Sequence, residues 1–126
     1  MAVSKDIRSV AGRQTTAGAA EETVLLSVDG SAPAASVAAP PDLEIIISGW
    51  LVTAEAPARF RLQQDRGSGF YDIAFLRVSV DGTVGLTDWG AIPIRIVGGS
   101  SFRVRVETPG GSTPVTVALR TYVDDR

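Results

Sequence analysis

The chain has 126 residues, of which 12 are basic and 14 acidic, and its formal net charge at pH 7 is −2. It contains no histidine and no cysteine, which excludes disulfides, thiol chemistry, an imidazole general base and the usual zinc and copper ligands. The near-neutral charge provides no field for attracting nucleic acid or an anionic membrane. We therefore expect one non-enzymatic domain without a cofactor, which binds neither nucleic acid nor membranes.

The first twenty residues carry scattered charges and many small side chains, but no sustained period. Such a segment has too little apolar side chain to offset the entropy lost on ordering. We predict an extended N-terminal arm over residues 1–22, mobile in the free protein, and a folded domain over residues 23–126. The arm contains no apolar run of signal-peptide length, and no later segment approaches the roughly 20 apolar residues of a membrane helix.

After the arm, Thr23–Val28 predicts a short strand that ends at the turn-forming pair Asp29-Gly30. The stretch 31–41 is rich in alanine and proline. Its prolines exclude a helix and restrict strand pairing. We expect a linker that crosses the surface toward the next strand.

Residues 43–52 (LEIIISGWLV) form the longest apolar run of β type. Read at strand period, this run has large apolar side chains on both faces. Both faces then need a cover, and either another subunit or the N-terminal segment has to provide the second one. We predict a subunit contact there. One face holds Leu43, Ile45, Ile47 and Leu51, and the predicted oligomer interface on the other face holds Ile46, Trp50 and Val52.

Six further strands are predicted from apolar alternation and from the glycine turns that separate them. In the stretch 71–80 the apolar positions change parity near Phe75 and Leu76, which predicts a β-bulge or a strand that changes sheets. Pro93 favours an edge position for its strand. The whole pattern predicts an all-β protein, a jelly-roll-type antiparallel β-sandwich with about eight strands. The six strands span residues 58–64, 71–80, 83–86, 91–97, 101–107 and 114–123.

Three sets of residues are candidate functional sites. Carboxylate pairs can hydrolyse glycosides, but a role in turns explains most of these acids. A calcium site at Asp81 and Asp88 lacks the dense acidic loop that such sites use. Trp89 lies in a predicted turn and either stacks on a sugar or caps the core. The acids considered are Asp65, Asp72, Asp81, Asp88 and Glu107.

Arginines occupy many outward positions of the predicted strands. They form either a solvated face with ion pairs or an assembly contact. The aromatic residues that single-stranded nucleic acid needs between them are absent. These arginines are Arg59, Arg61, Arg95, Arg103 and Arg105.

The order of strands and turns from Leu43 to Tyr122 resembles the small jelly-roll domains that serve as cement or decoration proteins on the heads of tailed phages. The resemblance implies a structural protein that assembles as a homotrimer, lies on the outer surface of the capsid head and bridges neighbouring subunits of the major capsid protein. The motifs that carry it are Phe60-Arg61-Leu62, Asp81-Gly82-Thr83, Trp89-Gly90 before Ile92-Pro93-Ile94, Gly98-Gly99-Ser100 before Phe102–Val106, and the closing strand Pro114–Tyr122.

In such proteins, the resemblance implies, an N-terminal arm reaches across the capsid lattice. We expect the cations Lys5, Arg8 and Arg13 of the arm to pair with acidic groups of the capsid, through contacts that weaken with salt. The alternative hypothesis is a carbohydrate- or receptor-binding β-sandwich module of a phage tail or fibre.

Overall fold

The structure, a computed structural model, describes residues 6–79, 82–86 and 94–125. This part of the chain forms β-strands and contains no helix, and so no helix that could cross a membrane. The strands are β1 (Asp6–Thr15), β2 (Glu22–Val24), β3 (Ser27–Val28), β4 (Val37–Ala38), β5 (Leu43–Ala54), β6 (Ala58–Asp65), β7 (Phe70–Val78), β8 (Gly82–Leu86), β9 (Ile94–Ile96), β10 (Ser101–Glu107) and β11 (Pro114–Asp125).

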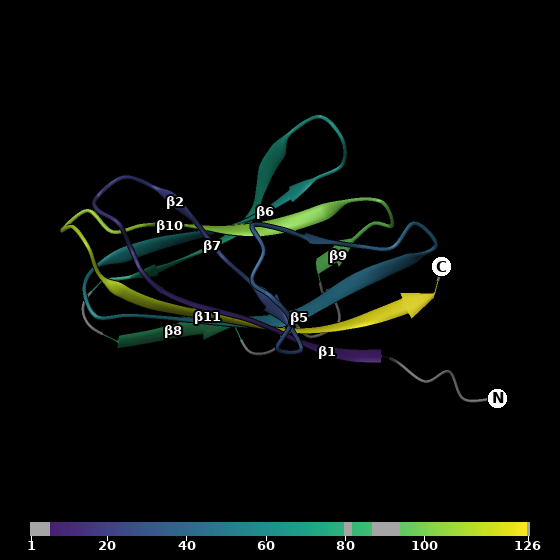
Figure 1. The fold of residues 1–126 in the computed structure, drawn as a ribbon, viewed down its shortest axis with the longest axis horizontal. Coiled ribbons are helices and arrows are strands. Elements are labelled where there is room, and N and C mark those ends of the chain that lie inside the picture. Colours follow the sequence, from purple (N-terminus) through teal and green to yellow (C-terminus); the bar gives the residue numbers. More distant parts are fainter. Residues whose placement is uncertain (1–5, 80–81, 87–93, 126) are drawn as a thin grey trace.

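The strands build two antiparallel sheets that pack face to face (Figure 1). Sheet A has the order β3-β1-β11-β5, and both β8 and β9 pair with the remaining side of β5. Sheet B has the order β2-β10-β6-β7, and β4 pairs with β10 beyond the end of β2. Each sheet therefore has four main strand positions, and β3 is a short addition to sheet A.

The path of the chain between the two sheets is that of a jelly roll. It runs from β1 in sheet A to β2 and β4 in sheet B, returns to β5, forms the β6–β7 hairpin in sheet B, and returns again to β8 and β9. The last two strands, β10 and β11, enter the centres of sheets B and A. Eight strand positions in two four-stranded sheets with this order define the jelly roll. The predicted fold class is confirmed.

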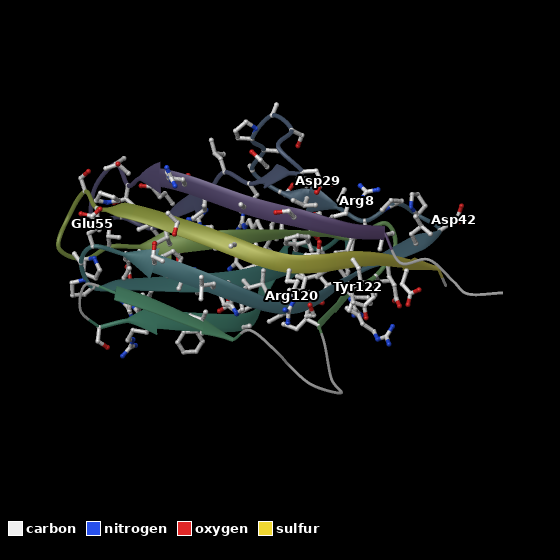
Figure 2. All side chains as sticks on the ribbon, turned by 90° about the horizontal axis from the view of Figure 1, so that it is seen from below. Arg8, Asp29, Asp42, Glu55, Arg120 and Tyr122 are labelled. Atoms are coloured by element: carbon white, nitrogen blue, oxygen red, sulfur yellow. The ribbon has the colours of Figure 1, made fainter. Side chains whose placement is uncertain are left out.

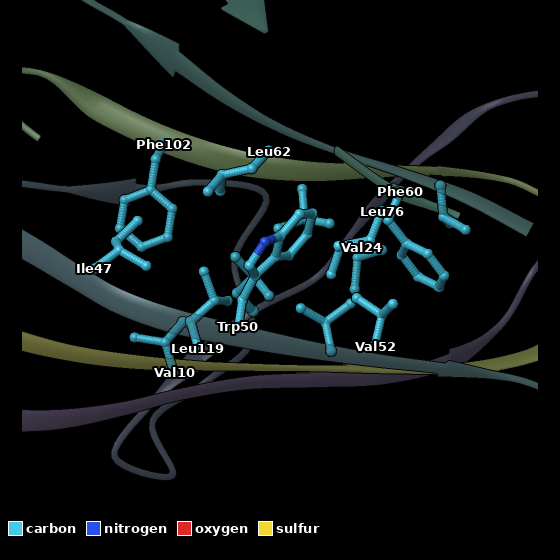
Figure 3. Close-up of a cluster of buried hydrophobic side chains, with 14 of the residues drawn as sticks. Val10, Val24, Ile47, Trp50, Val52, Phe60, Leu62, Leu76, Phe102 and Leu119 are labelled. Carbon is cyan, nitrogen blue, oxygen red and sulfur yellow. The ribbon is translucent and has the colours of Figure 1, made fainter. Parts of the chain in front are cut away.

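The core lies between the sheets and is almost entirely apolar. Figure 3 shows Trp50 projecting from β5 of sheet A toward the side chains of sheet B. Phe60, Leu62 and Phe102 project from sheet B into the same core and are fully buried. Burial of each large side chain stabilises the fold by about 1.5–3 kcal/mol relative to leaving it exposed.

A β-bulge interrupts β5. Gly49 pairs with Arg120 and Ile47 with Thr121, so Ser48 is an extra residue without an opposite partner on β11. The Ser48 hydroxyl donates a hydrogen bond to the Arg120 carbonyl oxygen at 3.2 Å and accepts one from its Nε at 3.2 Å. The bulged residue is therefore tied to the strand that it bypasses.

This bulge makes the predicted faces of β5 wrong. One extra residue reverses the inward and outward positions of a strand, so Ile47 before the bulge and Trp50 and Val52 after it all enter the core. Trp50 and Val52 are therefore covered by the opposite sheet of the same chain and are not available to another subunit. Ile46 does lie on the other face, but it is also fully buried. Leu51, expected in the core, is exposed instead.

The predicted N-terminal arm is also wrong for the part that the structure describes. All ten residues of β1 pair with β11, from Asp6 opposite Val123 to Thr15 opposite Pro114. Val10 belongs to the core cluster. The backbone ladder orders a segment whose own side chains are mostly small, so the domain boundary does not lie at residue 23.

The bulge predicted in the stretch 71–80 is present, slightly earlier than expected. Leu62 pairs with Ala74 and Gln63 with Asp72, which leaves Ile73 as the extra residue of β7. The residues after it are shifted by one position, and Phe75 consequently lies outside the core. Pro93, predicted at an edge, lies outside the described residues.

Candidate functional site

The residues predicted to contact a capsid do not form one cluster. Arg8 is half-buried in β1, whereas Arg13 is exposed. Five positions along a strand separate them, so their side chains leave opposite faces. Lys5 lies outside the described residues. Of the two described residues of this predicted set, only Arg13 is exposed on the outer face of sheet A.

Several of the acidic residues serve turns, as predicted. Asp65 accepts hydrogen bonds from the backbone N–H groups of Gly67 at 2.7 Å and Gly69 at 3.1 Å, which closes the β6–β7 hairpin. Asp29 adopts a positive φ of 51° and accepts a bond from Ser9 N at 2.9 Å. Within the described residues, no three acids gather as a metal site would require. Asp81, Asp88 and Trp89 lie outside these residues.

The outer face of sheet A is flat because its central side chains are small. One row of register partners crosses four strands, from Ala11 on β1 to Ala118 on β11, Leu51 on β5 and Gly85 on β8. Figure 2 looks onto this face, where β1, β11, β5 and β8 lie side by side. We call the surface formed by Ser9, Ala11, Leu51, Thr53, Thr116 and Ala118 the flat face.

Two shallow hollows of about 330 and 620 Å³ lie along the flat face and share Ser9, Leu51 and Ala118 as lining residues. Leu51 is 37% exposed, and Leu25, which lines the larger hollow, is 48% exposed. The six residues of the flat face carry no charge, although Ser9, Thr53 and Thr116 bear hydroxyl groups, and Arg8, Arg13 and Arg120 line the two hollows around them. The flat face is therefore an uncharged surface with exposed Leu51 near its centre and arginines at its rim.

The outer face of sheet B has the opposite character, because ion pairs cover it. Arg61 donates to Glu21 at 2.8 Å and to both Asp72 oxygens at 3.2 and 3.3 Å. Gln63 extends the network, since it donates to Asp72 at 2.9 Å and accepts from Arg103 at 2.8 Å. This network is the predicted solvated, ion-paired arginine face.

The network shifts the titration of its members. The hydrogen bond and the charge of Arg61 hold the pKa of Glu21 below its ordinary value. The Gln63 hydrogen bond, and then Arg61, lower the pKa of Asp72. Burial lowers the pKa of Arg103, and the neighbouring charge of Arg105 lowers it further. Both carboxylates are thus held in their charged form.

Arg105 also forms an ion pair with Glu21, at 3.4 Å, and two more arginines are paired elsewhere. Arg59 pairs with Glu107 on the outer face of sheet B. Arg95 belongs to β9 of sheet A and pairs with the buried Glu44. The predicted arginine group is therefore divided between the two sheets.

Two exposed apolar residues, Leu51 and Phe75, are not predicted as surface sites from the sequence. Uninterrupted alternation predicts a core position for Leu51, whereas Phe75 lies at the parity change that predicts the second bulge. The pair Ser48-Gly49 inside an apolar run was the available signal for the first bulge, because small residues often mark such an irregularity. The parity change near Phe75 and Leu76 is the signal for the second bulge, but it does not show which of the two neighbouring side chains is exposed.

No family model matches the chain, and no curated protein sequence matches it. Among solved structures, the chain is similar to the Eiger TNF of S. frugiperda, with 10% sequence identity over 92% of each chain and a TM-score of 0.45. A likeness at this level assigns no function. The function must therefore be argued from the surfaces of the chain itself.

Proposed function

We propose that the chain is a structural virion protein that decorates the outer surface of a tailed-phage head and stabilises the shell by bridging neighbouring major capsid protein subunits. In this proposal it acts as a homotrimer, and the flat face forms the contact between its subunits. The observation that carries the proposal is the contrast between the two outer faces. On the outer face of sheet B most charged side chains are paired with one another, whereas the six residues of the flat face include exposed Leu51 and no charged side chain.

The flat face suits an interface between subunits for two reasons. The centres of protein interfaces are depleted of charged residues, and the row from Ala11 through Ala118 to Leu51 meets that condition. Small side chains also permit close approach of a second backbone. This interface replaces the predicted one, since Trp50 and Val52 fill the core of the monomer.

Trimer formation increases the affinity of the protein for the capsid. Each subunit alone makes a weak capsid contact, and linking three of them raises the effective concentration of the second and third contacts. Arg13 is exposed at the rim of the flat face and supplies one cation for acidic capsid groups. Such rim contacts weaken as salt screens them.

Binding to phage heads that lack the protein tests this function. Wild type is expected to bind with saturation at hundreds of copies per head. Ala118→Arg places three like charges at the subunit contact of the trimer, so we expect at least about tenfold weaker head binding as avidity is lost. Bound copies are counted by quantitative gel analysis of purified heads.

Ala20→Arg is the matched control, because Ala20 is exposed in the loop between β1 and β2 and lies outside the flat face. It should bind heads as wild type does. Wild-type protein that fails to saturate heads, or that is found only on tail fibres, would contradict the proposed decoration role.

A further inference from the structure

Phe75 is the most exposed large apolar side chain in the described part of the chain, at 61%. It stands on the outer face of sheet B, opposite Arg61 on β6. A groove of about 450 Å³ runs beside it, within the size range of small-molecule sites. Its other lining residues are all charged: Glu21, Arg59, Arg61, Asp72, Arg77 and Glu107.

Arg77 supplies the groove with an unpaired positive charge. It follows Phe75 by two positions on β7, so both side chains leave the same face of the strand. Its register partner is Arg59, and like charges opposite one another in a sheet are unfavourable. Arg59 is neutralised by Glu107, whereas no described residue forms a hydrogen bond or ion pair with Arg77.

The remaining groups of the groove are held in place. Arg61 links Glu21 to Asp72 in one continuous network. Gln63, itself buried, fixes Asp72 from the other side. Fixed carboxylates offer oxygen acceptors at set positions, and this preorganisation lowers the entropy lost when a polar ligand binds.

We propose that this groove binds a pyranose ring that carries a carboxylate, such as a uronic-acid or sialic-acid residue of an acidic polysaccharide. The apolar C–H face of the ring stacks on Phe75, whose exposed face carries partial negative charge. Arg77 forms a bidentate ion pair with the sugar carboxylate. Asp72 and Glu107 accept hydrogen bonds from the ring hydroxyls. This site is independent of the proposed capsid role, since it lies on the opposite sheet from the flat face.

Other ligand classes fit the groove less well. A neutral sugar would stack on Phe75 but leave Arg77 without a partner. Nucleic acid presents closely spaced phosphates, whereas Arg77 is the one groove cation without an ion pair among the described residues and so matches a single carboxylate. An acidic peptide would satisfy Arg77, but its chain offers no flat apolar face comparable to a sugar ring.

Titration calorimetry of the full chain tests the site with four acidic probes and two controls. The acidic probes are oligogalacturonate, oligomannuronate, a hyaluronan tetrasaccharide and sialyllactose. The controls are lactose, which is neutral, and tetraglutamate, which is an acidic peptide. We expect at least one acidic sugar to bind, and both controls to bind at least about tenfold more weakly. Lactose lacks the carboxylate, and a hydrogen-bonded charge typically contributes that much discrimination. Tetraglutamate keeps the carboxylates but lacks a ring face that can stack on Phe75.

Two variants and their matched controls locate the binding. Phe75→Ala and Arg77→Gln are each expected to weaken binding at least about tenfold. Tyr71→Ala removes another exposed aromatic of β7, and Arg66→Gln removes an exposed arginine in the β6–β7 hairpin; both should bind as wild type does. Melting temperatures verify that all four variants are folded.

Three results would overturn the proposal. The first is that none of the four acidic sugars binds. The second is equal or tighter binding of tetraglutamate, which would assign the groove to acidic peptides. The third is an equal loss in Arg66→Gln and Arg77→Gln, which would show that only the overall charge attracts the ligand.

Discussion

Deletion of residues 1–15 is expected to abolish cooperative folding. The deletion removes β1, which pairs along its whole length with β11 and contributes Val10 to the core. Each backbone hydrogen bond contributes about 0.5–1.5 kcal/mol, so the loss of this ladder is comparable with the whole stability of a typical domain, about 5–15 kcal/mol. Circular dichroism during heating should show no sigmoidal transition.

A shorter deletion provides the control. Removal of residues 1–4 leaves β1 complete and should preserve both the transition and its midpoint within a few degrees. A cooperative transition near the wild-type temperature after removal of residues 1–15 would contradict this expectation. It would support the mobile N-terminal arm that the sequence predicts.

Trp50→Ala is expected to lower the free energy of unfolding by about 3–5 kcal/mol, the usual cost of emptying a large aromatic site in a core. Trp50 is only 2% exposed and packs between the sheets (Figure 3). Urea denaturation measures the change. The mass of the native assembly should stay the same under conditions where the variant is folded, because Trp50 does not belong to the flat face.

Trp50→Phe is the matched control for this experiment. The indole Nε1 is buried and has no hydrogen-bond partner in the described part of the chain, so its removal leaves no other group unsatisfied. Phenylalanine keeps most of the apolar contact and should lose less than half as much stability. A Trp50→Ala variant that keeps its stability but dissociates would contradict the core position and show that Trp50 lies in the subunit interface.

Much of the fold was predictable because it depends on short-range patterns. Alternation over residues 101–107 places Phe102, Val104 and Val106 in the core, as found. Asp65 followed by two glycines predicts the hairpin that it closes. These features require only the period of a strand and the chemistry of a turn.

The remaining features depend on partners far away in the sequence. β1 is ordered by β11, about a hundred residues later, and its own small side chains give no sign of that pairing. Glycine is required at position 12 of this strand, because a Cβ at Gly12 would lie 2.3 Å from the Leu25 carbonyl oxygen. Strong alternation marks apolar burial, but a strand ordered mainly by its backbone ladder leaves no such pattern.

The candidate surfaces also depend on strand pairing, through single residues inserted in two strands. Ser48 and Ile73 are each inserted against a partner strand. An insertion of one residue exchanges the two faces of everything that follows in the strand. Leu51 and Phe75 therefore become the exposed centres of the flat face and of the groove, while Trp50 moves into the core.

The mass of the protein in solution tests the central claim, that the flat face joins the subunits. Light scattering coupled to size exclusion should give three chains for wild type and for Ala20→Arg. Ala118→Arg should elute as a single chain that still melts cooperatively, because residue 118 is exposed in the monomer. Its melting temperature should fall only by the stabilisation that association gave to the wild type. A wild-type protein that remains a single chain at all concentrations, or an Ala118→Arg variant that remains a trimer, would contradict the account.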